Sequence, residues 1–217
     1  MNNTVTTIRN NTSRNMKGNF KDNYAAPSRF KEGLGRLVLR LMGGWTLQGQ
    51  LPDIGKYVMI VAHHTSNWDF VVGIAAKLIL RIKIRFFAKH SLFFWPLGVL
   101  MRGLGGVPIE RSKSINRVEQ AAKEIRESDS FVLAITPEGT RSRVERWKSG
   151  FYHIARSAEV PIVTVAFDFA NRRIVFGEPM TMTGDQEHDF REMHRFFLPY
   201  KPRYPELGCN GPFEKEQ

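Results

Sequence analysis

Short apolar runs alternate with longer amphipathic stretches along most of the chain. Runs rich in Val, Ile and Phe predict buried strands, and they occupy residues 57–62, 84–89, 106–110, 131–136, 161–167 and 173–177. Apolar residues that recur at intervals of three and four predict helices, and such patterns cover residues 68–80, 92–104, 115–127 and 151–158. Strands alternating with helices predict an α/β fold with a mixed, largely parallel sheet flanked by helices.

An additional amphipathic helix is predicted at the N-terminal side of these elements, within residues 28–45. Arg36 and Arg40 lie four residues apart on one face of this helix, and Gly43 and Gly44 end the pattern. Two interpretations stay open: the helix packs on the core, or it lies in a membrane interface with arginine on its polar side. The apolar positions that define its other face are Phe30, Leu34, Leu37, Val38 and Leu41.

The polar and proline-rich segments divide the 217 residues into four parts. Residues 1–27 are rich in Asn and Thr and are expected to be disordered, without the apolar centre of a secretory signal. Residues 28–50 form the amphipathic, membrane-proximal part, residues 51–198 the α/β domain, and residues 199–217 an extended tail. No uncharged run reaches the roughly 20 residues of a membrane-spanning helix.

The charge of the chain narrows the class of partner. A net charge of +11 favours anionic partners, such as nucleic acid, an acidic membrane surface or an acidic carrier protein. No acidic residue occurs between Asp69 and Glu110, where six Lys and Arg residues are interleaved with Phe, Leu, Ile and Trp. No nucleic-acid-binding module is recognisable. Cys209 is the only cysteine, which excludes an intrachain disulfide and fits a reducing compartment.

The first candidate site follows the strand predicted at residues 57–62, where His63, His64 and Asp69 come close together in sequence. A metal site is disfavoured because zinc usually needs at least three protein ligands and the other histidines are scattered. A histidine after a strand, with a carboxylate at the start of the next helix, can instead act as a general base for a hydroxyl. Helix capping by Ser66, Asn67 or Asp69 is the structural alternative. No G-x-S-x-G motif supports a covalent serine intermediate.

The second candidate site is the segment TPEGTRSRVERWKSG, residues 136–150. Pro137 and Gly139 predict a turn, and the strand at residues 131–136 delivers this turn to the carboxyl edge of the sheet. The segment is either a solvated basic loop or a phosphate-binding loop, and its density of donors favours the second interpretation. Those donors are Thr140, Arg141, Ser142, Arg143, Arg146 and Lys148.

Four blocks in order resemble the lysophosphatidic acid acyltransferase (PlsC-like) family of glycerolipid acyltransferases. The blocks are HTSNWD at residues 64–69, GVPIER at 106–111, PEGTRS at 137–142 and VPIVTVA at 160–166. The resemblance implies the glycerolipid acyltransferase fold for residues 51–198. It also implies a general base at His64, oriented by Asp69, and a fourth block that supports the site or borders the acyl chain. The positions implied to bind the acceptor are Arg111, Glu138, Gly139, Thr140 and Arg141.

The implied reaction moves a fatty acyl chain from an acyl-CoA or acyl carrier protein thioester to the hydroxyl of a lysophospholipid-like acceptor, above all 1-acylglycerol-3-phosphate. The enzyme would lie peripherally on the cytoplasmic face of an anionic membrane, with no metal, bound cofactor or nucleic acid. Other acceptors, such as a lyso-aminolipid or glycolipid, and a catalytically silent lipid-binding role are alternatives. Four positions depart from the family pattern: His63, Thr65, Glu110 and Thr136. The segment at residues 143–155 would add an aromatic wall that tunes acceptor choice, formed by Trp147, Phe151 and Tyr152.

Overall fold

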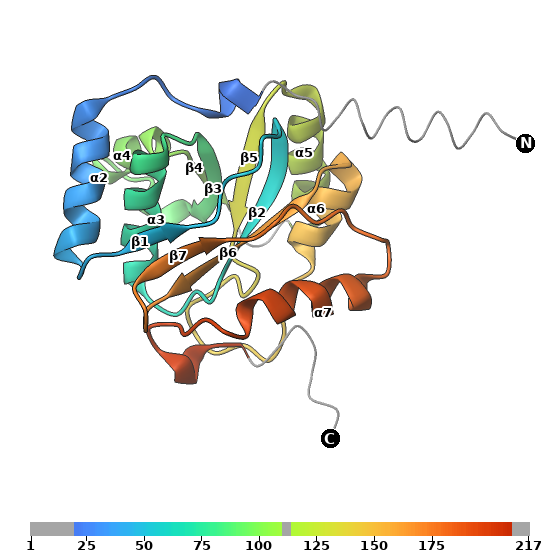
Figure 1. The fold of residues 1–217 in the computed structure, drawn as a ribbon. Helices are drawn as coiled ribbons and strands as arrows, with labels where there is room; N and C mark the ends of the chain where they lie inside the picture. The colour runs from blue at the N-terminus through green and yellow to red at the C-terminus, as the bar shows by residue number, and fades with distance from the viewer. Residues whose placement is uncertain (1–19, 110–113, 210–217) are drawn as a thin grey trace, which may run out of the picture.

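A computed structural model describes residues 20–109 and 114–209 of the protein, which form a seven-stranded sheet in the order β1-β7-β6-β2-β5-β3-β4 (Figure 1). Neighbouring strands are parallel except for β6 and β7, which form an antiparallel hairpin. The predicted fold class is therefore confirmed. The strands are β1 (Thr46–Gln48), β2 (Lys56–Ala62), β3 (Ile84–Lys89), β4 (Gly106–Ile109), β5 (Phe131–Ile135), β6 (Ile162–Asp168) and β7 (Arg173–Phe176).

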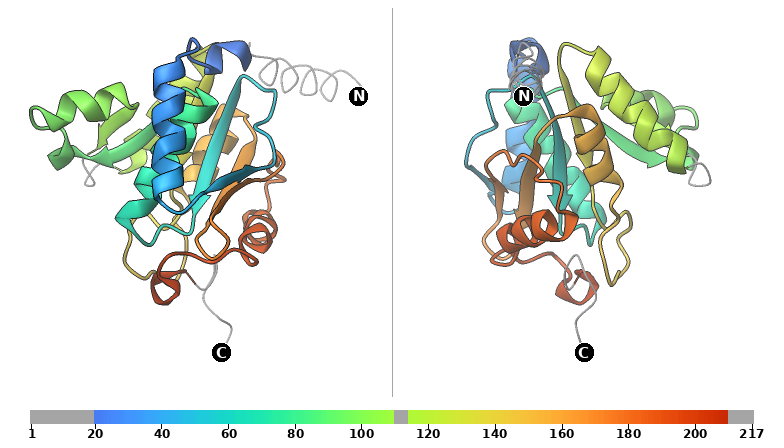
Figure 2. Two further views of the ribbon diagram at one scale, coloured as in Figure 1. Left: turned by 60° about the vertical axis from the view of Figure 1, so that its left-hand side comes forward. Right: turned by 90° about the vertical axis from the view of Figure 1, so that its right-hand side faces the viewer.

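Helices cover both faces of the sheet (Figures 1 and 2). One hydrophobic core joins α2 and α3 to the sheet, and a second lies under α5, α6 and α7 on the other face. The α-helices are α2 (Arg29–Leu41), α3 (Asn67–Leu80), α4 (Leu97–Gly103), α5 (Ser114–Glu127), α6 (Gly150–Ala158) and α7 (Gln186–Phe197). The short 3₁₀ turns are η1 (Phe20–Asn23), η2 (His90–Leu92) and η3 (Pro205–Leu207).

The central strand β2 explains where the candidate site lies. Val58 and Ile60 point into one core and Tyr57 and Met59 into the other, because successive side chains of a strand alternate between its faces. β2 pairs in parallel with both β5 and β6, so the carboxyl ends of these strands open at one edge of the sheet. Ligands of open α/β sheets bind at such an edge.

Helix α2 packs on α3 through the side that carries Gly35. A Cβ atom added at Gly35 would lie 2.7 Å from the Ala75 carbonyl oxygen, and Leu39 is buried. Most of the predicted apolar face points elsewhere and remains in water, whereas Val38 packs against the core. Its exposed fractions are 79% for Phe30, 43% for Leu34, 52% for Leu37 and 78% for Leu41. The helix was thus predicted correctly, but most of its large apolar residues do not form the core.

Two elements of the fold were not predicted, namely β1 and α7. Helix α7 begins at the cap Asp185, whose side chain accepts hydrogen bonds from the backbone of Glu187 and His188. The helix predicted over residues 92–104 is shorter and begins only after Pro96, as α4. Across residues 20–109 and 114–209, no helix has both the length and the apolar character needed to cross a membrane.

Candidate functional site

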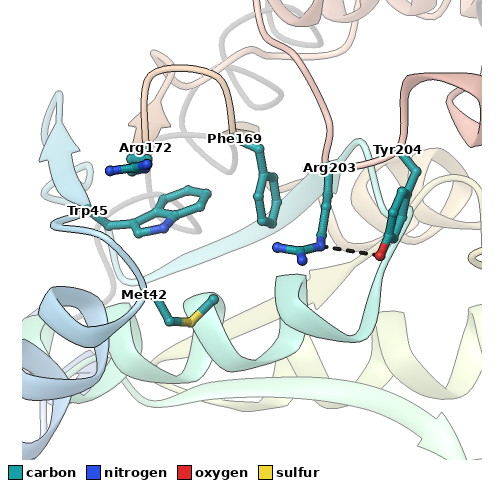
Figure 3. A pocket seen from close by; sticks show the side chains of 6 residues that line it. All are labelled: Met42, Trp45, Phe169, Arg172, Arg203 and Tyr204. Atoms are coloured by element: carbon teal, nitrogen blue, oxygen red, sulfur yellow. Dashed lines mark hydrogen bonds between the residues drawn. The ribbon is translucent and has the colours of Figure 1, made fainter.

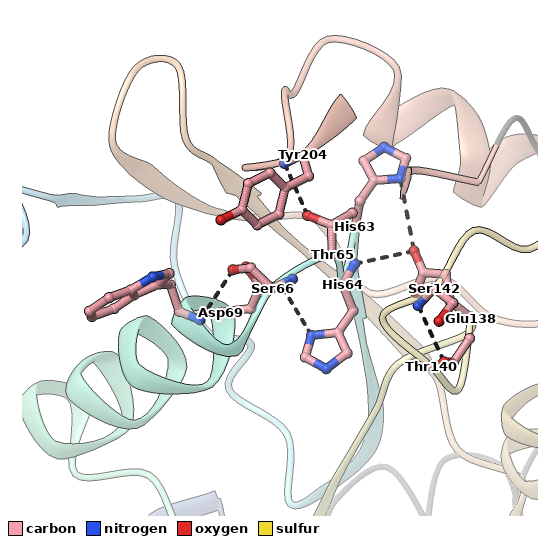
Figure 4. A network of polar contacts seen from close by, with 10 residues as sticks. His63, His64, Thr65, Ser66, Asp69, Glu138, Thr140, Ser142 and Tyr204 are labelled. Carbon is pink, nitrogen blue, oxygen red and sulfur yellow. Dashed lines mark hydrogen bonds and ion pairs between the residues drawn. The ribbon is translucent and has the colours of Figure 1, made fainter. Parts of the chain in front are cut away.

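Residues 63–69, here called the 63–69 turn, comprise the turn after β2 and the first residues of α3. They hold a histidine and a carboxylate in direct contact (Figure 4). His64 Nδ1 lies 3.1 Å from Asp69 Oδ2, and the Asp69 side chain is fully buried while 16% of the His64 side chain is exposed. The His64 side chain therefore borders solvent, and the Asp69 side chain does not. This is the pairing that the H-x4-D spacing predicted.

Asp69 also caps α3. Its Oδ2 accepts a hydrogen bond of 2.8 Å from the Ser66 backbone N–H, and its Oδ1 accepts one of 3.0 Å from the Ser66 hydroxyl. The Ser66 hydroxyl in turn accepts from the Trp68 N–H, which completes a capping box. Asp69 therefore forms the helix cap that was one of the two alternatives, and the cap fixes the position of the carboxylate that contacts His64.

This geometry determines which nitrogen of His64 can act as a base. An ionised carboxylate only accepts hydrogen bonds, so the contact with Asp69 places the imidazole proton on Nδ1. The lone pair of Nε2 is then available to a hydroxyl group. Asp69 would also stabilise the imidazolium that forms when this nitrogen takes a proton.

The loop that follows β5 brings Glu138 against the 63–69 turn. Gly139 adopts a left-handed φ of +64°, and its N–H donates to the Thr136 carbonyl at 3.0 Å, which closes a tight turn. Glu138 is only 2% exposed, and its Oε1 accepts a long hydrogen bond of 3.4 Å from the His64 backbone N–H. The PEGTRS block therefore supports the backbone at His64.

His63 and Glu138 face each other in this buried region without forming an ion pair. His63 Nδ1 lies 3.8 Å from Glu138 Oε1, which is too long for a hydrogen bond. Burial raises the pKa of Glu138 to about 7. Burial first, and then the charges of His194 and Lys201, lower the pKa of His63 to about 4. His63 is therefore neutral at neutral pH. His63 Nδ1 and Glu138 Oε2 are buried without a hydrogen-bond partner among the described residues.

The two pKa shifts have opposite effects on stability. Between about pH 4.5 and 7 the folded protein holds the Glu138 proton more tightly than the unfolded chain does, so its contribution to stability falls as pH rises. Between about pH 4 and 6.5 the unfolded chain holds the His63 proton more tightly, so its contribution rises with pH. Each contribution amounts to roughly 3 kcal/mol, and the two largely cancel where the windows overlap.

Removing one partner should expose the contribution of the other. Thermal unfolding of His63→Asn should show a Tm that falls, relative to wild type, as pH is raised from about 4 to 6.5, because the His63 contribution that rises over this range is lost. Glu138→Gln should show the reverse trend, a rising relative Tm between about pH 4.5 and 7, because the Glu138 contribution that falls over that range is lost. Parallel Tm profiles for all three proteins would contradict burial as the cause of the two shifts.

The other residues implied to bind the acceptor are placed in part. The Thr140 hydroxyl accepts a hydrogen bond from the Ser142 N–H at 3.3 Å (Figure 4). Arg141 is exposed and forms no ion pair with any described residue. Arg111 and Glu110 lie outside the described residues.

The predicted aromatic wall beside this loop is wrong. Trp147 is 4% exposed, Phe151 2% and Tyr152 0%, and all three belong to the core under α5, α6 and α7. Trp147 precedes α6 and is in edge contact with Phe151 of that helix. These rings therefore position the loop from within and cannot contact an acceptor.

The segment 199–209 contributes to the site although the sequence predicted only an extended tail. The Tyr204 N–H donates to the Thr65 hydroxyl at 3.3 Å, and the Lys201 carbonyl accepts from the Phe169 N–H at 2.8 Å. The segment is thus held against the 63–69 turn. Its proline content gave no signal for this contact.

An open pocket of about 430 Å³ lies beside the same segment (Figure 3). The Arg203 guanidinium lies 5.5 Å from the centre of the Trp68 ring, so the pocket borders the start of α3. His64 and Asp69 do not line this pocket, so the exposed part of the His64 side chain lies elsewhere on the 63–69 turn. The pocket is lined by Met42, Trp45, Phe169, Arg172, Arg203 and Tyr204.

Comparisons with known proteins agree on one family. The sequence profile described as Acyltransferase matches residues 45–168. A 1-acyl-sn-glycerol-3-phosphate acyltransferase of Haemophilus influenzae is 28% identical in an alignment of 141 residues that covers 60% of this chain and 57% of that protein. The chain therefore spans a little over half the length of this relative.

A solved structure gives the same architecture. The 1-acyl-sn-glycerophosphate (LPA) acyltransferase PlsC of Thermotoga maritima superposes with a TM-score of 0.54 over 76% of this chain and 73% of that one, at 18% identity. This similarity concerns the fold. Of the residues that the structure describes, no group of three or more His, Cys, Asp and Glu side chains could hold a metal ion.

Proposed function

The chain belongs to the acyltransferase family, and we propose that it transfers a fatty acyl chain from a thioester to the hydroxyl of a lysophospholipid-like acceptor, 1-acylglycerol-3-phosphate first among them. The observation that carries the proposal is the 3.1 Å contact of His64 with the buried Asp69 at the carboxyl edge of the sheet. Similarity to the 1-acyl-sn-glycerol-3-phosphate acyltransferase of Haemophilus influenzae supports this acceptor.

In the proposed mechanism His64 Nε2 takes the proton of the acceptor hydroxyl while its oxygen attacks the thioester carbonyl carbon. Asp69 stabilises the imidazolium through Nδ1. When the tetrahedral intermediate collapses, the carbon–sulfur bond breaks and the thiolate leaves with the proton from the imidazolium. The products are an ester and a free thiol, carried by coenzyme A or by an acidic acyl carrier protein. No metal, bound cofactor or nucleic acid takes part.

The acceptor phosphate is assigned to the loop after β5. Arg141 is exposed there without a carboxylate partner among the described residues, and its planar guanidinium suits two hydrogen bonds to a phosphate. Gly139 and Thr140 would line the same site, and Glu138 would hold it against the turn. Arg111 of the second block would complete it.

We also assign the enzyme to the cytoplasmic face of an anionic membrane, as a peripheral protein. The exposed apolar face of α2, from Phe30 to Leu41, is flanked by Arg36 and Arg40, and the chain carries a net charge of +11. A helix of this kind binds at the interface by its apolar face and by attraction to anionic lipids. Acyl transfer to a lyso-aminolipid or glycolipid, or lipid binding without catalysis, is the alternative.

The acceptor is tested by replacing Arg141 with alanine. The KM for 1-acylglycerol-3-phosphate should rise about 10-fold or more, because a hydrogen bond to a charged group contributes roughly 1.5–3 kcal/mol. The KM for a neutral monoacylglycerol should stay unchanged. Arg191→Ala, which removes an exposed arginine of α7, is the matched control and should affect neither substrate.

The same assay covers the whole proposal when wild type is offered a panel of lyso-lipids with both coenzyme A and carrier-protein thioesters. Mass spectrometry identifies each acylated product. If only a lyso-aminolipid is acylated, the proposed acceptor is wrong and the lyso-aminolipid takes its place. If the protein binds vesicles but consumes no thioester, the proposed reaction is wrong and lipid binding without catalysis takes its place.

A further inference from the structure

The connection between β3 and β4 forms a projection that the reaction does not use. Residues 90–104, here called the η2–α4 arm, extend from the end of the sheet where β3 and β4 lie (Figure 2, left). Most of the large apolar side chains of this arm are in water. The exposed fractions are 61% for Phe94, 83% for Trp95, 65% for Val99 and 57% for Leu100.

The opposite side of the arm is fixed to the domain. Met101 is buried, and the Lys77 ammonium of α3 donates a hydrogen bond to the Leu104 carbonyl. The Gly98 N–H donates to the Phe94 carbonyl, and a side chain at Gly98 would collide with the backbone of Phe93. The exposed residues are therefore held outward by a packed base, and they cannot turn inward without breaking it.

Positively charged residues lie near the exposed apolar residues in the sequence. Lys83, Lys89 and Arg102 are exposed, and none of them forms an ion pair with the described part of the chain. No acidic residue occurs in the sequence between Asp69 and Glu110. Exposed apolar residues with unpaired cations near them in the sequence fit an anionic lipid interface, where tryptophan lies at the level of the head groups. A second copy of the chain would instead bring like charges together.

We propose that the η2–α4 arm is a membrane-contact element that inserts Phe94, Trp95, Val99 and Leu100 into the interface of an anionic bilayer, together with the apolar face of α2. This inference extends the membrane attachment proposed above. Both elements are fastened to α3, α2 through Gly35 and the arm through Lys77. Because Asp69 lies in the first turn of α3, contact at two points would fix the orientation of the catalytic turn relative to the bilayer.

The test is vesicle binding by the double variant Phe94→Ser/Trp95→Ser. Partitioning onto vesicles of phosphatidylglycerol and phosphatidylcholine, measured by co-sedimentation, should weaken at least about 10-fold. Serine at these positions lacks most of the favourable free energy that a large apolar side chain gains when it leaves water. Leu198→Ser removes an equally exposed apolar residue at the end of α7 and should bind like wild type. Both variants should keep the wild-type Tm, because the replaced side chains face water.

A second measurement locates the arm without relying on affinity. Brominated acyl chains should quench part of the tryptophan fluorescence of wild type, and Trp95→Phe should remove most of that quenching. Undiminished vesicle binding by the double variant, or quenching that survives in Trp95→Phe, would overturn the proposal. The proposal would also be overturned if the double variant were monomeric where wild type is dimeric and vesicle binding were unchanged. The exposed residues of the arm would then contact a second copy of the chain.

Activity measurements separate this inference from the proposed reaction. The double variant should acylate a short-chain, water-soluble acceptor at the wild-type rate and a vesicle-embedded acceptor more slowly. If wild type transfers no acyl group but the double variant still loses vesicle binding, the reaction is wrong and the arm remains a membrane contact. If acyl transfer occurs and both acceptors are used equally by the variant, the arm has no such role.

Discussion

Replacing His64 with alanine is expected to lower kcat for acyl transfer about 10²–10⁴-fold, the usual contribution of a general base. The side chain is 16% exposed and its polar contact is with Asp69, so its loss should leave the fold intact. The hydroxyl of the acceptor would then have to attack without a group to take its proton. Steady-state kinetics with saturating thioester and lyso-lipid measure the effect directly.

The control for this change is His153→Ala, which removes an exposed imidazole on α6. It should retain wild-type kcat and Tm. A His64→Ala protein that is folded and fully active would contradict the assignment of the base. His63 cannot take over the role, because burial lowers its pKa to about 4 and its ring is turned toward Glu138.

Asp69→Asn is expected to lower kcat by at least about 10²-fold while keeping most of the cap of α3. The amide oxygen can still accept from the Ser66 N–H, and the amide N–H₂ can donate to the Ser66 hydroxyl. These positions now hold Oδ2 and Oδ1. The negative charge that stabilises the His64 imidazolium is lost, and the effect should therefore appear in kcat and hardly in Tm.

Ser66→Ala separates the two roles of Asp69. Loss of the capping hydroxyl should destabilise the protein by about 1 kcal/mol, because the Trp68 N–H loses its acceptor. The Asp69 carboxylate keeps its bond to the Ser66 backbone, so kcat should fall far less than in Asp69→Asn. Equal losses of kcat in the two variants would mean that Asp69 acts through the cap alone.

Local pattern was sufficient to predict the contact between His64 and Asp69, whose catalytic roles stay predictions. β2 is buried on both faces, so its apolar run was continuous, and the helix that follows starts at a strong N-cap, Ser66. His64 and Asp69 lie within one turn, so that no long-range contact was needed to bring them together. The roles assigned to the acceptor-binding residues stay predictions.

Long-range packing accounts for what the sequence did not reveal. Trp147 and Phe151 follow a basic loop, which suggested a wall at the surface, but α7 covers them and that helix was not predicted. The burial of His63 and Glu138 likewise results from surrounding segments, including α7 and residues 199–209, and no local pattern encodes it. The exposed faces of α2 and the η2–α4 arm resemble core positions in sequence, because periodicity records which residues share a face and not what that face meets.

The bond between Tyr204 and Thr65 joins residues 139 positions apart, and this separation has a consequence during synthesis. The catalytic turn leaves the ribosome long before residues 199–209, at about 5–20 residues per second. A nascent chain would therefore display the 63–69 turn for several seconds without the segment that lies against it. Maturation of the site would be among the last events of folding, and translation itself would delay the appearance of activity.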